Sequence, residues 1–340
     1  MPVTMKDIAR DLGVSVVTVS KALREHTDIS EETRQRVLKR VRELNYYPNL
    51  AARALVTGKT YALGLVVPDL VHPFFAELAQ GLSSVLRQKN YSLLISSSEE
   101  DARLERQEIE RLLSRGVDAI IVASTQCTVE SFRHIEENHT PYVLVDRRFM
   151  GLPANFVGVD DVAVGRLATQ HLISVGCTRI AHIRGPATST ALGRLEGYNQ
   201  ALAANHLGPF NGCVVPARSG DVGTYGSGGE SMSKLLSLNP TPDGVFCYND
   251  PIGIGAIDTI LEAGLRVPED IAVIGCGNLH YDKSLRVPLS SVDQQSAAIG
   301  ERAARLALSL IQARTPPRPK SIILEARVVP RASTQRKPLP

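Results

Sequence analysis

From Tyr61 onward, short apolar runs alternate with longer amphipathic stretches, and this alternation limits the possible folds more than any other feature of the chain. Such runs are typical of buried strands, and stretches with a 3.6-residue period are typical of helices. The expected strands are 62–67, 91–96, 119–123, 142–145, 179–184, 245–248 and 271–275, and the expected helices include 74–88, 103–114, 162–174, 194–205 and 252–263. Strict alternation predicts an α/β fold of doubly wound parallel sheets, and two successive sets indicate two similar lobes.

The first residues have a different pattern, that of two short helices joined by a tight turn. Thr4 and Asp7 form a capping box at the start of one helix, and Gly13 ends it. Ser15 caps a second helix, expected over 16–23. Apolar residues at helical spacing give each helix one face that can pack on the other around Val14. The pattern predicts a helix-turn-helix.

The opposite face of the second helix presents Val16, Val17, Ser20 and Lys21. Apolar side chains at the start of a recognition helix can contact thymine methyl groups, and a lysine one turn later can donate to guanine. Alternatively, the two valines cover a third helix, which Ser30 caps and in which Arg34, Arg36, Lys39, Arg40 and Arg42 form a basic face. That basic face can approach phosphates or simply be solvated. The residues alone leave both alternatives open.

Positive charge is concentrated in this N-terminal region. Residues 1–60 contain 11 Lys or Arg and 7 Asp or Glu, whereas the remaining residues contain 27 and 28, within an overall net charge of +3. The imbalance favours a polyanion as partner of the first region, although a surface of this charge is also compatible with simple solvation.

Other classes of protein are not indicated. No apolar run approaches the ~20 residues of a membrane span, and the first residues lack the apolar stretch of a secretory signal. The five cysteines are isolated, so we expect reduced thiols, no metal site and no cofactor. No G-x-S-x-G or phosphate-binding G-x-x-x-x-G-K-[ST] motif occurs, and His134 and His139 near two glutamates are expected on a solvated helix face.

The order of motifs in the first 60 residues resembles the headpiece of the lactose-repressor (LacI/GalR) family of transcription factors. The matching motifs are Met5-Lys6-Asp7-Ile8-Ala9, Gly13-Val14-Ser15, Thr18-Val19-Ser20-Lys21-Ala22-Leu23 and Leu44-Asn45-Tyr46-Tyr47-Pro48-Asn49. The resemblance continues through nearly the whole chain. It implies a helix-turn-helix headpiece over 1–48, a hinge helix and linker over 49–60, and a periplasmic-binding-protein-like core over 61–340. The first lobe would comprise about 61–160 and 293–321, the second about 161–290 and 322–332, with crossings near 158–161, 289–293 and 321–324.

The resemblance also implies which residues contact operator DNA. They are Thr4, Ser15, Val16, Val17, Thr18, Ser20, Lys21, Thr33, Arg34, Tyr46, Asn49, Arg53 and Leu55. In the family the hinge helix folds on DNA, and by position Leu55 is the leucine that enters a minor-groove step and kinks the duplex. The alternative for Leu55 is a core position in a linker helix.

A small effector is expected between the lobes, at the carboxyl ends of the strands. The side chains expected there are His72, Phe74, Phe75, Asp146, Arg147, Arg194, Asn249 and Asn278. Phe74 and Phe75 can stack on a ring or belong to the core, and Asp146 and Arg147 can simply pair with each other. Many relatives have an acid where this chain has Gly277 and an aromatic where it has Val222. With that acid missing and two arginines present, the sequence favours a sugar acid over a neutral sugar.

The resulting hypothesis is a cytoplasmic, homodimeric repressor that binds a pseudo-palindromic operator under the control of a sugar or sugar acid. No leucine heptad follows the core, so a dimer is expected. One alternative is a small-molecule binding protein for transport, which would leave the headpiece without a role. The other is a sugar-active enzyme, which catalytic turnover of a bound sugar would reveal.

Overall fold

The computed structural model describes residues 3–23, 26–47, 54, 58–126, 130–149, 153–217 and 225–336. The chain forms two compact units, Met1–Thr60 and Tyr61–Pro340. No helix within the described ranges is both long and apolar enough to cross a membrane. Asn49, Arg53 and Leu55 of the predicted hinge helix lie outside the described residues.

The smaller unit contains α1 (Met5–Leu12), α2 (Val16–Leu23) and α3 (Glu31–Glu43). The carboxylate of Asp7 accepts hydrogen bonds from the backbone N–H (3.0 Å) and the hydroxyl (2.7 Å) of Thr4, which fixes the first turn of α1. Gly13 ends α1 with a φ of 65°, a left-handed conformation that glycine adopts without strain. Ser15 Oγ accepts from the backbone N–H of Thr18 at 3.0 Å. Both helices therefore begin where their capping residues predict.

The three helices enclose a small apolar core, made of Ile8, Ala9, Val19, Ala22, Val37 and Tyr46. Val37 of α3 packs with Val19 and Ala22 of α2, so α3 is covered without the valines at the start of α2. The apolar faces predicted for α1 and α2 thus meet in the core, and the helix-turn-helix is present.

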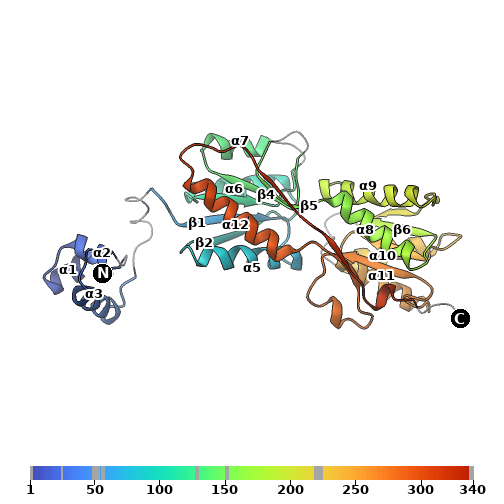
Figure 1. Ribbon diagram of the computed structural model, residues 1–340, viewed down its shortest axis with the longest axis horizontal. Coiled ribbons are helices and arrows are strands. Elements are labelled where there is room, and N and C mark those ends of the chain that lie inside the picture. The colour runs from blue at the N-terminus through green and yellow to red at the C-terminus, as the bar shows by residue number, and fades with distance from the viewer. Residues whose placement is uncertain are drawn as a thin grey trace. The chain divides into compact units, whose positions relative to one another are not determined.

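The first sheet of the larger unit is parallel throughout, with strand order β11-β5-β4-β3-β1-β2. Its strands are β1 (Ala62–Val67), β2 (Ser92–Ser97), β3 (Ala119–Val122), β4 (Tyr142–Val145), β5 (Phe156–Val159) and β11 (Ser321–Leu324). Helices α5 (Pro73–Arg87) and α12 (Ser296–Gln312) cover one face, and α6 (Ala102–Ser114) and α7 (Glu130–Glu137) cover the other (Figure 1).

The second sheet has the order β12-β10-β9-β8-β6-β7, in which only the edge strand β12 is antiparallel to its neighbour. Its strands are β6 (Ile180–Arg184), β7 (Val214–Pro216), β8 (Gly244–Cys247), β9 (Ala272–Cys276), β10 (Ser290–Asp293) and β12 (Arg327–Val329). Helices α8 (Asp161–Ser174) and α9 (Ser189–Ala204) pack on one face, and α10 (Tyr225–Leu236) and α11 (Asp250–Glu262) pack on the other. The predicted two-lobed, doubly wound α/β fold is confirmed.

The chain passes between the two sheets three times, and two crossings lie later than predicted. The first is at Asp160, between β5 and α8. The second follows Asp293 rather than lying within 289–293, because β10 completes its pairing with β9 first. The third follows Leu324 rather than lying within 321–324, because β11 pairs with β5 in the first sheet. Residues 322–324 therefore belong to the first lobe.

Candidate functional site

The first turn of α2 presents two exposed apolar side chains. Val16 is 37% exposed and Val17 is 62% exposed, although Val19 and Ala22 of the same helix are fully buried. The alternative that these valines cover α3 is therefore wrong. A hydrophobic pair that the fold leaves in solvent, backed by a packed core, is suited to contact with an apolar partner such as the methyl groups of a DNA groove.

The polar residues predicted to contact DNA have partners within the smaller unit. The Lys21 ammonium donates to the carboxylate of Asp28. Arg34 lies 3.2 Å from Glu31 and donates to the backbone oxygen of His26. Thr4, Ser15, Thr18 and Thr33 form the hydrogen bonds at the helix starts, and Ser20 is half-buried.

Tyr46 differs from the other predicted DNA contacts. Its side chain is only 8% exposed and packs in the core of the smaller unit. The structure thus gives its ring a packing role. The basic face of α3 is also partly neutralised, because Arg40 pairs with Asp11 at 2.6 Å and Glu43 at 3.1 Å.

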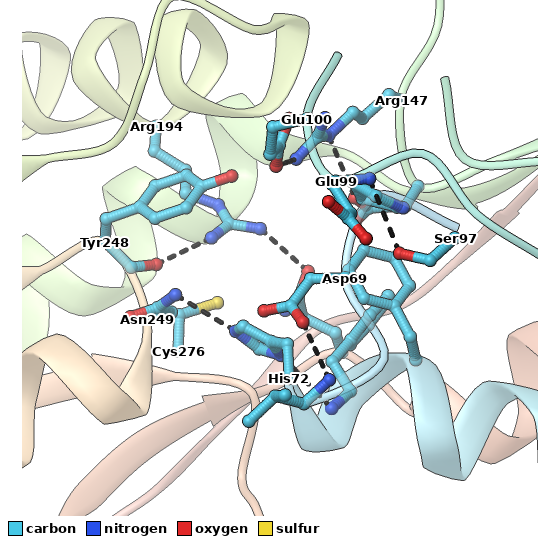
Figure 2. Close-up of a pocket in the computed structure, with 16 residues that line it drawn as sticks. Asp69, His72, Ser97, Glu99, Glu100, Arg147, Arg194, Tyr248, Asn249 and Cys276 are labelled. Atoms are coloured by element: carbon cyan, nitrogen blue, oxygen red, sulfur yellow. Dashed lines mark hydrogen bonds and ion pairs between the residues drawn. The ribbon is translucent and has the colours of Figure 1, made fainter. Parts of the chain in front are cut away.

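A cavity of about 290 Å³ lies between the two lobes of the larger unit. Loops that follow β1, β2 and β4 supply one wall, and residues of α9, β9 and the ends of β8 and β10 supply the other. Figure 2 shows Asp69, His72 and Glu99 facing Arg194, Tyr248 and Asn249 across this space. The cavity occupies the position expected in parallel sheets, at the carboxyl ends of the strands.

Arg194 is the most completely bonded side chain of the cavity. Its Nε donates to Asp161 at 3.1 Å, one terminal nitrogen to the backbone oxygen of Tyr248 at 2.6 Å, and the other to the Gln294 side chain at 2.8 Å. The guanidinium also stacks on the Tyr248 ring, 4.6 Å from its centroid. The pKa of Arg194 is raised despite burial, because Asp161 and other negative groups surround it, so Arg194 stays charged.

Close packing of α8 and α9 sets the position of Arg194. A side chain at Gly165 of α8 would place its Cβ 2.0 Å from the backbone oxygen of Arg194, and one at Gly197 of α9 would be equally close to Val162. Only glycine permits this approach, which brings Asp161 at the start of α8 beside the guanidinium.

Arg147, at the end of β4, pairs with Glu100, which follows β2. Its two terminal nitrogens lie 2.8 and 2.6 Å from the two carboxylate oxygens, a bidentate pair. Its Nε is buried without a hydrogen-bond partner in the described part of the chain and lies 3.9 Å from the carboxylate of Asp146. Asp146 has a positive φ of 62°, and burial raises the pKa of its carboxyl group.

His72 contributes a neutral ring. Burial is the main cause that lowers its pKa to about 4. The positive charges of Arg147 and Arg194 also lower this pKa, and their effect exceeds the opposite effect of the nearby Glu100. One ring nitrogen accepts from the backbone N–H of Phe74, and the other lies 3.0 Å from the amide nitrogen of Asn249. Phe74 and Phe75 are nearly fully buried and also line the cavity, so they take part in both the core and the wall.

Asn278 is the predicted effector residue that does not line this cavity. Its side-chain oxygen instead accepts a hydrogen bond from Arg331, and its backbone N–H donates to Ser291. The other predicted residues, His72, Phe74, Phe75, Asp146, Arg147, Arg194 and Asn249, all line it. Sequence reasoning missed Asp69, Glu99, Glu100, Tyr248, Cys276 and Gln294. Most of these follow predicted strands, so the rule for parallel sheets could have found them, whereas Gln294 follows β10, which was not predicted.

The sequence-based preference for an acidic ligand loses its basis in this geometry. Both arginines on which it depended are already paired with carboxylates. Gly277 has a φ of 139°, and a Cβ there would lie 2.8 Å from Asp250 Oδ2. The buried carboxyl of Asp250 thus occupies the space that a side chain at 277 would need.

A helix-turn-helix unit joined to a two-lobed binding unit with a cavity between its lobes defines the class of ligand-responsive DNA-binding proteins. Two family models match the chain: "Bacterial regulatory proteins, lacI family" over residues 4–49 and "Periplasmic binding protein-like domain" over residues 169–334. The chain is 31% identical to an HTH-type transcriptional repressor PurR of Mannheimia succiniciproducens, over 89% of this chain and 90% of that protein. It is 33% identical to the ribose operon repressor of Escherichia coli K12, over 88% and 90%.

A solved structure is similar over nearly the whole chain. The complex of the transcriptional regulator CelR with cellobiose has a TM-score of 0.74 and 29% identity, covering 97% of this chain and 99% of that one. The chain belongs to the lacI family of bacterial regulatory proteins. It is a DNA-binding transcriptional regulator of the ligand-modulated kind.

Proposed function

We propose that this protein is a repressor whose α2 enters the major groove of an operator and whose DNA affinity changes when a small effector binds between the lobes. The exposed pair Val16–Val17 on the first turn of α2 carries the proposal, because neither side chain belongs to the described core of the smaller unit. Repression is supported by the two relatives, which are both named repressors. Lys21 would exchange Asp28 for a guanine edge on binding.

The effector is a small polyhydroxylated molecule. The cavity of about 290 Å³ suits one small ligand. Asp146 and the unpartnered Nε of Arg147 can together bind one hydroxyl group, which would donate to the carboxylate and accept from Arg147. Among the similar proteins, one is a ribose operon repressor and another is complexed with cellobiose, which supports a sugar.

The proposed role as a repressor also implies an oligomeric state. Two copies related by two-fold symmetry would place two α2 helices on the half-sites of a pseudo-palindromic operator. We propose a homodimer that acts in the cytoplasm, where such DNA is located, and that binds its effector without chemical change. Neither a metal nor a cofactor enters this role.

Val17→Ser tests the apolar contact. Because Val17 is exposed, the substitution should change the free energy of unfolding by less than about 0.5 kcal/mol. Loss of a methyl contact in each half-site should weaken operator binding about tenfold, with binding to non-specific DNA unchanged. The operator is first selected from a random duplex library, and affinities are then measured by fluorescence anisotropy. Leu192→Ser, which alters a similarly exposed apolar residue of the larger unit, serves as control. Equal operator binding by the two variants would contradict the contact.

Lys21→Ala tests base recognition against simple charge attraction. Specific binding should fall steeply as salt rises, because phosphate contacts release counterions. If Lys21 contacts a base, the variant should discriminate less between operator variants while the slope of log affinity against log salt stays nearly constant. A change in slope with unaltered selectivity would assign Lys21 to a phosphate instead.

A further inference from the structure

The charges that line the cavity are unequal. Four carboxylates, those of Asp69, Glu99, Glu100 and Asp146, face the two guanidinium groups of Arg147 and Arg194. His72 adds no positive charge, because burial holds its ring neutral at physiological pH. The wall therefore has an excess of negative charge before any ligand enters.

The two guanidinium groups are already committed to protein partners. Glu100 occupies both terminal nitrogens of Arg147. Each of the three nitrogens of the Arg194 guanidinium already donates a hydrogen bond, to Asp161, Tyr248 and Gln294. Among the described residues, the one nitrogen of these two groups without a hydrogen-bond partner is the buried Nε of Arg147, and the Asp146 carboxylate already lies 3.9 Å from it. An anionic ligand would thus displace a protein carboxylate or lie against one, and either arrangement costs affinity.

The remaining carboxylates are available to a ligand. Asp69 accepts from the backbone N–H of Val71 at 2.7 Å, and neither Asp69 nor Glu99 forms an ion pair with a described residue. Both lie on the first-lobe side of the cavity, facing Arg194 and Tyr248 (Figure 2). Arg147 lines the cavity, and its buried Nε has no hydrogen-bond partner among the described residues, so the wall has one donor left for a ligand atom.

We infer that the effector is a polyhydroxylated molecule that carries a positively charged amino group, an amino sugar or a close analogue, and that sugar acids are rejected. Hydroxyl groups bond Asp146 and the Nε of Arg147, and the ammonium group pairs with Asp69 or Glu99. A bare metal ion does not fit, because the described residues contain no cluster of three or more potential metal ligands. The inference rests on the proposed function only in taking the cavity as the effector site.

Isothermal titration of the full-length protein tests this charge preference. The probes are a hexose, its 2-amino-2-deoxy derivative and its uronic acid, in the gluco, galacto and manno configurations. In at least one configuration the amino sugar should bind ten times more tightly than the hexose, because a charge-assisted hydrogen bond is stronger than a neutral one. The uronic acid should bind more weakly than the hexose. A hexose or uronic acid that equals the amino sugar in every configuration, or no binding by any amino sugar, overturns the inference.

Variants identify the carboxylates responsible. With Asp69→Asn combined with Glu99→Gln, the amino sugar should bind no more tightly than the hexose does to the same variant. Glu110→Gln removes an exposed carboxylate on α6, outside the cavity, and should keep the full tenfold preference. Retention of the preference in the double variant overturns the assignment.

A separate operator assay shows whether the inferred ligand class or the proposed function is wrong. If the wild-type protein binds a selected operator and a neutral hexose or uronic acid releases it, the ligand class is wrong and the proposed function stands. If the protein shows no sequence preference on DNA, the proposed function fails, and the titration still measures the charge preference of the cavity.

Discussion

Arg194→Ala should lower the free energy of unfolding of the larger unit by about 3–5 kcal/mol, the usual cost of breaking a buried ion pair. Arg194 is 3% exposed, and its removal leaves Asp161 buried without its cation and Gln294 without its donor. It also opens a space beside the Tyr248 ring. Urea unfolding of the full chain, followed by circular dichroism and tyrosine fluorescence, measures the loss, since the chain contains nine tyrosines and no tryptophan.

Two controls distinguish the stability lost by breaking a buried ion pair from the stability lost by removing any arginine charge. Arg266→Ala breaks the exposed pair with Asp270 on the surface of the same unit and should cost less than about 1 kcal/mol. Combining Arg194→Met with Asp161→Asn removes both buried charges and should recover much of the stability lost in Arg194→Ala. Equal losses in Arg194→Ala and Arg266→Ala would mean that burial contributes nothing to this pair.

Asp282→Asn should stabilise the protein at alkaline pH and flatten its pH dependence. Asp282 is fully buried beside Asp250, and neither of its carboxyl oxygens accepts a hydrogen bond within the described residues. Burial and the neighbouring Asp250 raise the pKa of Asp282 to about 9. Arg331, whose guanidinium lies 3.9 Å from the Asp282 carboxyl, lowers this pKa by a smaller amount. Asp282 is thus a neutral acid at pH 7 and can donate to Asp250, as an asparagine amide would.

The sign of the effect follows from proton linkage. A carboxyl group whose pKa is higher in the folded chain contributes stability that is complete below its ordinary pKa of 3.8 and is lost as pH rises through about 9. Between pH 7 and pH 8.5 the wild type should lose about 2 kcal/mol more than the variant. Urea unfolding of both proteins across this range measures the difference. Parallel pH profiles would show that Asp282 is ionised in the folded protein.

The strands found from sequence are those with apolar runs, and β10 shows why others were missed. Its residues Ser290–Asp293 are all buried, yet three of the four are polar. Ser291 Oγ donates to Asp250, and Ser290 Oγ donates to the backbone oxygen of Arg331 and bonds Thr334 Oγ1. These partners lie about 40 residues away in the chain, so only the folded structure reveals that the polar groups are satisfied. The strands β5, β7, β11 and β12 are also absent from the predicted set, although β5 and β11 are mostly apolar.

The residues of the candidate site, like the strands, are predicted from the sequence only in part. The rule that ligands bind at strand ends, together with family positions, led to His72, Arg147, Arg194 and Asn249. The sequence could not show that Glu100, 47 residues before Arg147, would take both of its terminal nitrogens. This pair and the pair of Arg194 with Asp161 together remove the basis for expecting an acidic ligand.

Arg194 also links the binding wall to residues next to two of the segments that cross between the lobes. Asp161 adjoins the first crossing and Gln294 the second, and both bond the same guanidinium group. A ligand that moved this guanidinium group would therefore also disturb the residues next to the first two crossings. A molecule that binds one arrangement of these residues more tightly than another shifts the population of the protein toward that arrangement.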